Sequence, residues 1–222
     1  MNPSPGPRTS LADLATRFPA ASRILRRERL DYCCGGRRSL EDACRSRGLD
    51  PQALLLEMEE AAAPAPAVDW TTRPLDELVR HIVGHYHEPL RDELPELVAL
   101  ARKVESVHRD KASVPRGLAD HLIVMEREVR EHLAKEEQVL FPLILAGHGA
   151  DAGAPVQMME TEHQDHGRNL AHVREITGDL TPPADACTTW RALYLRLATL
   201  ESELMDHIHL ENNVLFPRAL CE

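Results

Sequence analysis

Aromatic residues are scarce in this sequence: phenylalanine, tryptophan and tyrosine together make up 4% of its 222 residues. Leucine, valine, isoleucine and alanine must therefore fill any core, and a hydrophobic content of 43% is enough for one. Basic residues are also in deficit, with 26 against 36 acidic ones and a formal charge of −10. This balance argues against nucleic acid as a partner, because sequence-independent binding of nucleic acid requires a basic surface.

Long hydrophobic runs are missing as well, and no stretch approaches the length of a membrane-spanning helix. The amino terminus lacks the basic-then-apolar pattern of a signal peptide. Cysteine is limited to five residues, an odd number that does not suit a disulfide framework. We therefore expect a cytoplasmic protein in a reducing setting, without a membrane as partner.

Proline and glycine divide the chain into parts. Short helical patterns separated by turn signals predict a small helical domain over residues 1–62. The run Ala63-Pro64-Ala65-Pro66-Ala67 has the composition of a stiff, extended linker, which we place over residues 63–73. Residues 74–222 then change to longer amphipathic patterns and form the second predicted domain.

In this second domain apolar residues recur every three or four positions, the spacing of helices with one buried face. No stretch shows the alternation typical of a strand. The sequence therefore predicts an all-α fold, an up-down-up-down four-helix bundle. Its helices are predicted at about residues 75–104, 116–145, 155–177 and 186–219. Pro142 and Pro217 are expected to kink or end the last turn of the second and fourth helices.

One motif, H-x3-E-x2-V-L-F-P, occurs twice, from His132 to Pro142 and from His207 to Pro217. Residues four apart in a helix lie on the same face, so each copy presents an imidazole and a carboxylate one turn apart. A single pair of this kind is most often a solvated ion pair on a helix surface. Here both histidines fall in register with the apolar stripe of their helix, which predicts that they point into the bundle.

The other two helices repeat the arrangement with one histidine each. His87 precedes His132 by 45 residues, and His163 precedes His207 by 44. Six inward donors on facing helices predict a two-metal carboxylate site, in which each ion takes two histidines and both glutamates are shared. The ligand types suit iron, with manganese and zinc as alternatives. The six predicted ligands are His87, His132, Glu136, His163, His207 and Glu211.

Further polar residues accompany these motifs. Glu128 and Glu203 lie one turn before a predicted ligand, and Glu160 and Glu162 stand beside His163. Each is either a carboxylate on the helix surface or a group that orients ligands and carries protons or ions. The remaining histidines are expected on polar faces or in loops: His81, His85, His108, His121, His148, His166, His172 and His209.

A second candidate site lies in the first domain, where Asp31-Tyr32-Cys33-Cys34 is followed by two glycines. Adjacent thiols before glycines offer accessible sulfur chemistry, although their spacing is not that of a zinc or thioredoxin motif. The alternative is that Cys33 and Cys34 are only small, half-buried residues before a turn.

Taken together, these motifs resemble those of the repair-of-iron-centres family, the YtfE/ScdA type of di-iron protein. The resemblance covers almost the whole chain and implies a ScdA-like amino-terminal domain followed by a hemerythrin-like bundle. It implies two non-haem iron ions in an oxo- and carboxylate-bridged centre, held by the six residues named above. It also matches Cys33 and Cys34 to the adjacent cysteines of the family, and Glu128 and Glu162 to carboxylates lining the approaches to the iron.

The function that this resemblance implies is repair of iron–sulfur clusters damaged by nitrosative or oxidative stress, by donation of iron. Damaged iron–sulfur proteins are then the partners, together with small diatomic molecules such as NO or O2. The sequence leaves two alternatives open: a di-iron oxidoreductase that reduces NO or peroxide, and a sensor that binds O2 or NO. It also leaves open whether the protein is an enzyme and whether it forms a homodimer.

Overall fold

The computed structural model describes residues 5–18, 20–61 and 68–221, and residues 63–67 of the linker predicted over 63–73 lie outside these ranges. Regular structure in the described residues is helical, apart from one isolated bridge between Ser10 and Ser39. No helix in these ranges is both long enough and apolar enough to cross a membrane. The chain divides into two compact units, Met1–Pro74 with Met205–Arg218, and Leu75–Leu204 with Ala219–Glu222.

Short helices form most of the first unit. Three of the four begin at a side chain that accepts a backbone N–H and so satisfies part of the exposed first turn. Ser10, Ser39 and Asp50 play this role for α1, α3 and α4. The bounds are α1 (Leu11–Arg17), α2 (Ala21–Arg27), α3 (Leu40–Arg45) and α4 (Pro51–Glu60).

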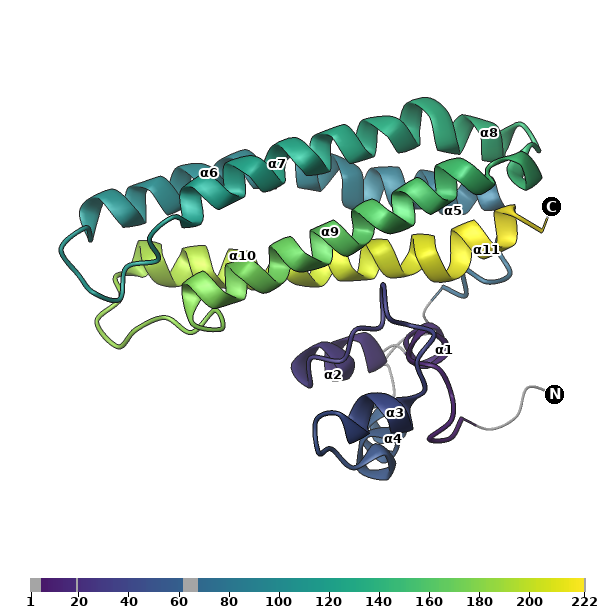
Figure 1. Cartoon of the computed structure of the whole chain (residues 1–222), viewed down its shortest axis with the longest axis horizontal. Coiled ribbons are helices and arrows are strands. Elements are labelled where there is room, and N and C mark those ends of the chain that lie inside the picture. The colour runs from purple at the N-terminus through teal and green to yellow at the C-terminus, as the bar shows by residue number, and fades with distance from the viewer. Residues whose placement is uncertain (1–4, 19, 62–67, 222) are drawn as a thin grey trace. The chain divides into compact units, whose positions relative to one another are not determined.

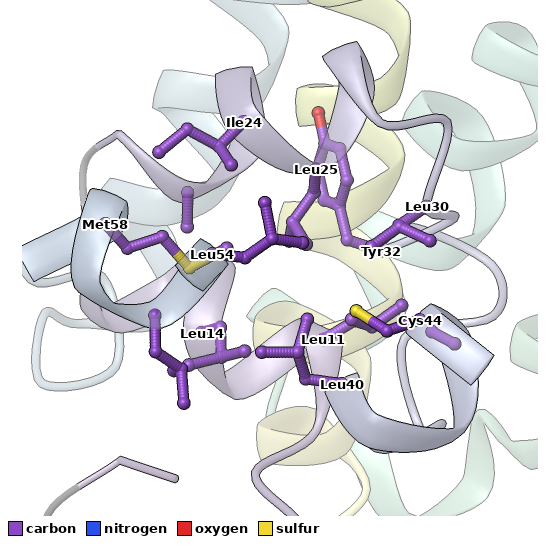
Figure 2. Close-up of a cluster of buried hydrophobic side chains, with 13 residues drawn as sticks. Leu11, Leu14, Ile24, Leu25, Leu30, Tyr32, Leu40, Cys44, Leu54 and Met58 are labelled. Carbon is purple, nitrogen blue, oxygen red and sulfur yellow. The ribbon is translucent and has the colours of Figure 1, made fainter. Parts of the chain in front are cut away.

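The first unit has a hydrophobic core of its own, drawn in Figure 2. Leucines from α1 to α4 converge there with the ring of Tyr32, which is fully buried. Met205 packs against the same cluster and ties the segment Met205–Arg218 to these helices. The buried members are Leu11, Leu14, Ala21, Ile24, Leu25, Leu30, Tyr32, Leu40, Ala43, Cys44, Leu54, Leu55 and Met58.

Four rods of helix run alongside one another in Figure 1, and the second unit contains all of them except Met205–Arg218 of the fourth rod. The first rod is α5 and α6 joined by the π-helical turn η1, and the second is α7 and α8 joined by η2. The third is α9, preceded by the short η3, and the fourth is α10, which continues through η4 into α11. The bounds are α5 (Leu75–Ile82), η1 (Val83–His87), α6 (Glu88–Val107), α7 (Leu118–Lys135), η2 (Glu136–Leu140), α8 (Phe141–Leu145), η3 (Gly149–Asp151), α9 (Gly153–Thr177), α10 (Thr188–Leu210), η4 (Glu211–Leu215) and α11 (Phe216–Ala219).

Side-chain bonds between neighbouring rods close the bundle into a ring. They link α6 to α7, α7 to α9, α9 to α10, and α10 back to α6. The predicted four-helix bundle and the all-α class are thereby confirmed. The bonds join Arg130 to the carbonyl of Arg91, Asn169 to Glu128, Arg174 to Glu201, and Arg196 to Glu93.

Pro142 and Pro217 do not end their helices, so that part of the expectation that they would kink or end the last turn was wrong. A π-helical turn precedes each one, and Phe141 and Phe216 donate their N–H to the carbonyl five residues back. A proline ring clashes with the carbonyl four residues before it, and the wider turn moves that carbonyl away. The helix therefore continues past the proline. Pro89 follows the turn η1 in the same way.

Candidate metal centre

The three π-helical turns coincide with predicted ligands. His87 is the last residue of η1, while Glu136 and Glu211 are the first residues of η2 and η4. Turns of this kind occur frequently at functional sites because they re-aim side chains within a continuous helix. The remaining ligands lie in regular helix: His132 in α7, His163 in α9 and His207 in α10. All six side chains are buried, with exposed fractions between 0% and 2%.

The structure brings these six residues together in two groups of four. The first group holds His87, His207 and the two glutamates, and the second holds His132, His163 and the same glutamates. Within each group one donor atom per residue lies within 4.8 Å of the others. Glu136 and Glu211 thus belong to both groups. Two overlapping groups that could each hold a metal ion therefore share both carboxylates.

Carboxylates outside the cluster fix the imidazole orientations. Nδ1 of His87 lies 2.8 Å from Oε1 of Glu137, and Nδ1 of His132 lies 2.9 Å from Oε2 of Glu162. An ionised carboxylate only accepts, so each Nδ1 carries the proton and donates it in the hydrogen bond. In the neutral ring, Nε2 then presents its lone pair to the centre of the cluster.

This arrangement fits metal ions. Nε2 of His132 lies 3.0 Å from Nε2 of His163 and 3.4 Å from Oε2 of Glu136. Nε2 of His87 lies 3.5 Å from the same carboxylate oxygen. Electron pairs that converge in a dry interior repel one another, and a cation between them converts this repulsion into coordination. The described donor set of imidazoles and carboxylates contains no thiolate, which suits first-row metals such as iron.

The two orienting carboxylates stay ionised at neutral pH. Hydrogen bonds from His132 and Lys135 lower the pKa of Glu162 to about 2, against the opposing effect of burial. Burial raises the pKa of Glu137, but hydrogen bonds from His87 and Arg91 outweigh it and leave this pKa lowered. Both groups can therefore accept the Nδ1 protons of the histidines.

The other candidate carboxylates are placed differently from one another. Glu162 contacts a predicted ligand, whereas Glu128 accepts a hydrogen bond of 2.8 Å from the Asn169 amide. The Glu203 side chain is 45% exposed and lies 4.0 Å from His85. Sequence reasoning missed Glu137, although it directly follows the predicted ligand Glu136. In a regular helix a neighbour of an inward ligand turns aside, and η2 changes this direction.

Two histidines expected on polar faces are buried instead. His166 is 2% exposed, and its ring centroid lies 4.9 Å from that of His132. It follows His163 by three residues, a spacing that places both on one helix face and would have predicted its burial. His209 is 6% exposed and packs edge-on against Tyr32 of the first unit. Nothing in the local pattern of α10 indicates this contact.

The segment that carries His207 and Glu211 is anchored within the first unit. The hydroxyl of Tyr32 donates a 2.7 Å hydrogen bond to Asp206, the residue before His207. The amide of Asn213 donates to the carbonyl of Cys33 at 3.1 Å. The loop after α2 thus holds the side chains of Asp206 and Asn213, which flank the two predicted ligands.

Cys33 and Cys34 lie in the loop that follows α2, and they belong to a third group of potential ligands together with Asp31. Cys33 is buried and Cys34 is half-buried. The hydrogen bond to Cys34 and burial raise the pKa of the Cys33 thiol well above its usual value. In the metal-free protein Cys33 is therefore protonated at neutral pH and is a weak nucleophile.

Comparison with known proteins agrees with this geometry. Residues 78–219 match the family described as the hemerythrin HHE cation binding domain, and residues 8–62 match ScdA_N, a domain of unknown function. The chain therefore belongs to the hemerythrin HHE family, with a ScdA_N domain ahead of the cation-binding domain. The family resemblance expected from the sequence is confirmed.

Particular relatives carry a more specific name. The chain is 48% identical to the iron-sulfur cluster repair protein YtfE of an Enterobacter species, over 95% of this chain and 96% of the relative. It is 46% identical to the proteins of the same name from Citrobacter koseri and Pectobacterium atrosepticum, with the same shares covered.

Proposed function

We propose that the six buried residues hold two non-haem iron ions and that Glu136 and Glu211 bridge them. Support comes from the two overlapping groups of donors, since only the two carboxylates are common to both. Each ion then has two imidazoles of its own, and the carboxylates balance part of its charge in the dry interior. When bound, the iron supplies redox chemistry and positions for a small ligand.

We further propose that the protein repairs damaged iron–sulfur clusters by donating iron to the damaged proteins. The observation that carries this proposal is the buried donor cluster in a chain whose relatives, similar over 95% of its length, are named iron-sulfur cluster repair proteins. Free cysteines throughout the described chain fit a reducing, cytoplasmic setting for such an exchange.

A route for iron supports donation. Glu162 touches the ligand His132 on one side and Lys135 on the other, and the Lys135 side chain is 44% exposed. A chain of polar contacts thus runs from the buried donors to solvent. Glu128 lies on the same pair of helices, held by Asn169 of α9. We assign Glu162 and Glu128 to this route, the first in contact with a ligand and the second without such a contact.

Cluster reconstitution tests the proposal. The iron-loaded protein is added, under anaerobic reducing conditions, to a cluster enzyme inactivated by NO, and recovery of activity is measured. Wild type should restore the enzyme, and His132→Ala and His207→Ala should abolish recovery. His121→Ala is the matched control, because His121 lies on α7 outside both donor groups. Recovery no better than with an equal amount of free ferrous iron would refute donation.

Reduction of NO or peroxide is the competing activity, because two ions with open positions also suit small ligands such as NO or O2. The same preparation separates the two functions. Sustained conversion of NO to N2O without loss of iron would identify an enzyme. Transfer of iron to an apo-protein, with matching loss from the donor, would identify repair.

A further inference from the structure

Three potential ligands of the first unit converge on one point in the loop after α2. Sγ of Cys33 lies 3.7 Å from Sγ of Cys34 and 3.3 Å from Oδ1 of Asp31. The three ligand atoms all lie within 4.8 Å of one another. This group contains sulfur and therefore differs in kind from the histidine and glutamate cluster.

The distances match ligands that share one ion. Zn–S bonds of about 2.3 Å at a tetrahedral angle place two sulfur atoms roughly 3.8 Å apart. A bonded disulfide needs an S–S distance of about 2.05 Å, well below the separation seen here. The same tetrahedron places a carboxylate oxygen roughly 3.6 Å from each sulfur. Small adjustments of the three side chains would therefore complete the coordination.

The loop is held in this shape before any ion binds. Oδ1 of Asp31 accepts the backbone N–H groups of Cys33 and Cys34, at 3.2 Å and 2.9 Å. The carbonyl of Cys33 accepts hydrogen bonds from the amides of Asn212 and Asn213. Such preorganisation lowers the entropic cost of binding.

Gly36 closes the loop and fits only because it lacks a side chain. A Cβ at this position would lie 2.5 Å from the carbonyl oxygen of Tyr32 and 2.9 Å from Cβ of Ala12. Its own carbonyl accepts the N–H of Ala12 at 2.9 Å, which fixes the loop against α1.

We propose that Asp31, Cys33 and Cys34 form a second metal site, which takes one divalent cation of borderline softness such as Zn²⁺ or Fe²⁺. Two thiolates select this class over Mg²⁺ and Ca²⁺. Asp31 is exposed and Cys34 half-buried, so the ion is accessible from one side. Three protein ligands leave a fourth position open, which is typical of catalytic rather than structural sites. This proposal does not depend on the iron-donation function.

Cadmium titration tests the site with a signal that the histidine cluster cannot give. Cd²⁺ is added to the reduced full-length protein, and the thiolate-to-cadmium charge-transfer absorption is followed. Wild type should show a band that saturates at one Cd²⁺ per chain and decreases when Zn²⁺ is added. Cys34→Ser should remove at least half of the band, and Asp31→Asn should weaken binding about tenfold.

Matched controls use the other cysteines. Cys187 is exposed and lies beside His108, so Cys187→Ser removes a thiol outside the group and should leave the band unchanged. Cys34→Ser is preferred over Cys33→Ser because Cys34 is less buried, and circular dichroism verifies that the variant folds. Its content of iron in the histidine cluster should equal that of wild type, which separates this test from the proposed function.

Two results would overturn the proposal. One is the absence of the band in protein whose thiols titrate as free and reduced. The other is saturation at half a Cd²⁺ per chain, because two chains would then share the ion through single exposed cysteines.

Discussion

Replacing Glu162 by alanine should release one of the two metal ions far more readily than the other. The carboxylate of Glu162 accepts the Nδ1 proton of His132, and His132 belongs to only one of the two donor groups. Removing a carboxylate that orients a metal-bound histidine typically lowers metal affinity 10- to 100-fold, or about 1.4–2.7 kcal/mol. The Glu162 side chain is 24% exposed, so water can replace part of this hydrogen bond and we expect about tenfold.

The assay is stepwise removal of iron by a chromophoric chelator under anaerobic conditions, which yields two apparent dissociation constants. Glu162→Ala should raise one constant about tenfold and change the other less. Glu137→Ala should do the same for the group that contains His87, whose Nδ1 it accepts at 2.8 Å. Glu126→Ala is the control, because its partner on α7 is Arg130 and not a ligand. Equal weakening of both ions, or an equal effect of Glu126→Ala, would refute the reasoning.

Three further predictions concern stability, measured by urea unfolding of metal-free protein. Arg174→Ala should cost about 3 kcal/mol, because it leaves the buried carboxylate of Glu201 without its cation. Tyr32→Phe should cost about 1–3 kcal/mol, because the partly buried Asp206 loses a hydrogen bond. Burial lowers the pKa of His209 to about 4 from 6.5. The folded protein holds His209 in its neutral form, so it loses about 3 kcal/mol of stability as the pH falls from 6.5 to about 4. His209→Gln should flatten this dependence of stability on pH.

Each of these predictions has a control in the same protein. Arg196 pairs with Glu93 where both side chains are about one-third exposed, so Arg196→Ala should cost about 1 kcal/mol or less. If Arg174→Ala and Arg196→Ala lowered the free energy of unfolding equally, burial of the ion pair would not explain the difference predicted between them. Tyr194 lies outside the first unit and is not the partner of Asp206. Tyr194→Phe should therefore lower the free energy of unfolding less than Tyr32→Phe does. An unchanged pH profile in His209→Gln would show that another group titrates in this range.

The bundle and the six donors were predictable because their signals are local. Apolar spacing defines each rod, and the repeated motif places a histidine and a glutamate one turn apart on the buried stripe. His87 and His163 followed from the near-equal distances to His132 and His207. None of these inferences requires knowledge of the partner across the helix interface.

Features that depend on the facing helix were not predictable. Glu128 and Glu162 look alike in the sequence, yet one meets Asn169 and the other a ligand. Glu137 reaches His87 because the π-helical turn η2 changes the direction of its side chain. That turn precedes Pro142, whose ring a regular helix would not accommodate. The sequence pattern predicts that His209 is exposed, but in the structure its ring packs against Tyr32, which lies 177 positions earlier in the chain.

Iron analysis with Mössbauer spectroscopy of anaerobically loaded protein tests the central claim most directly. The two overlapping donor groups predict two iron ions per chain, coupled through shared carboxylates. Glu136→Ala should disturb both ions, whereas His163→Ala should disturb chiefly the ion that it shares with His132. A wild-type chain that binds a single iron, or two uncoupled ions that survive Glu136→Ala unchanged, would contradict the account.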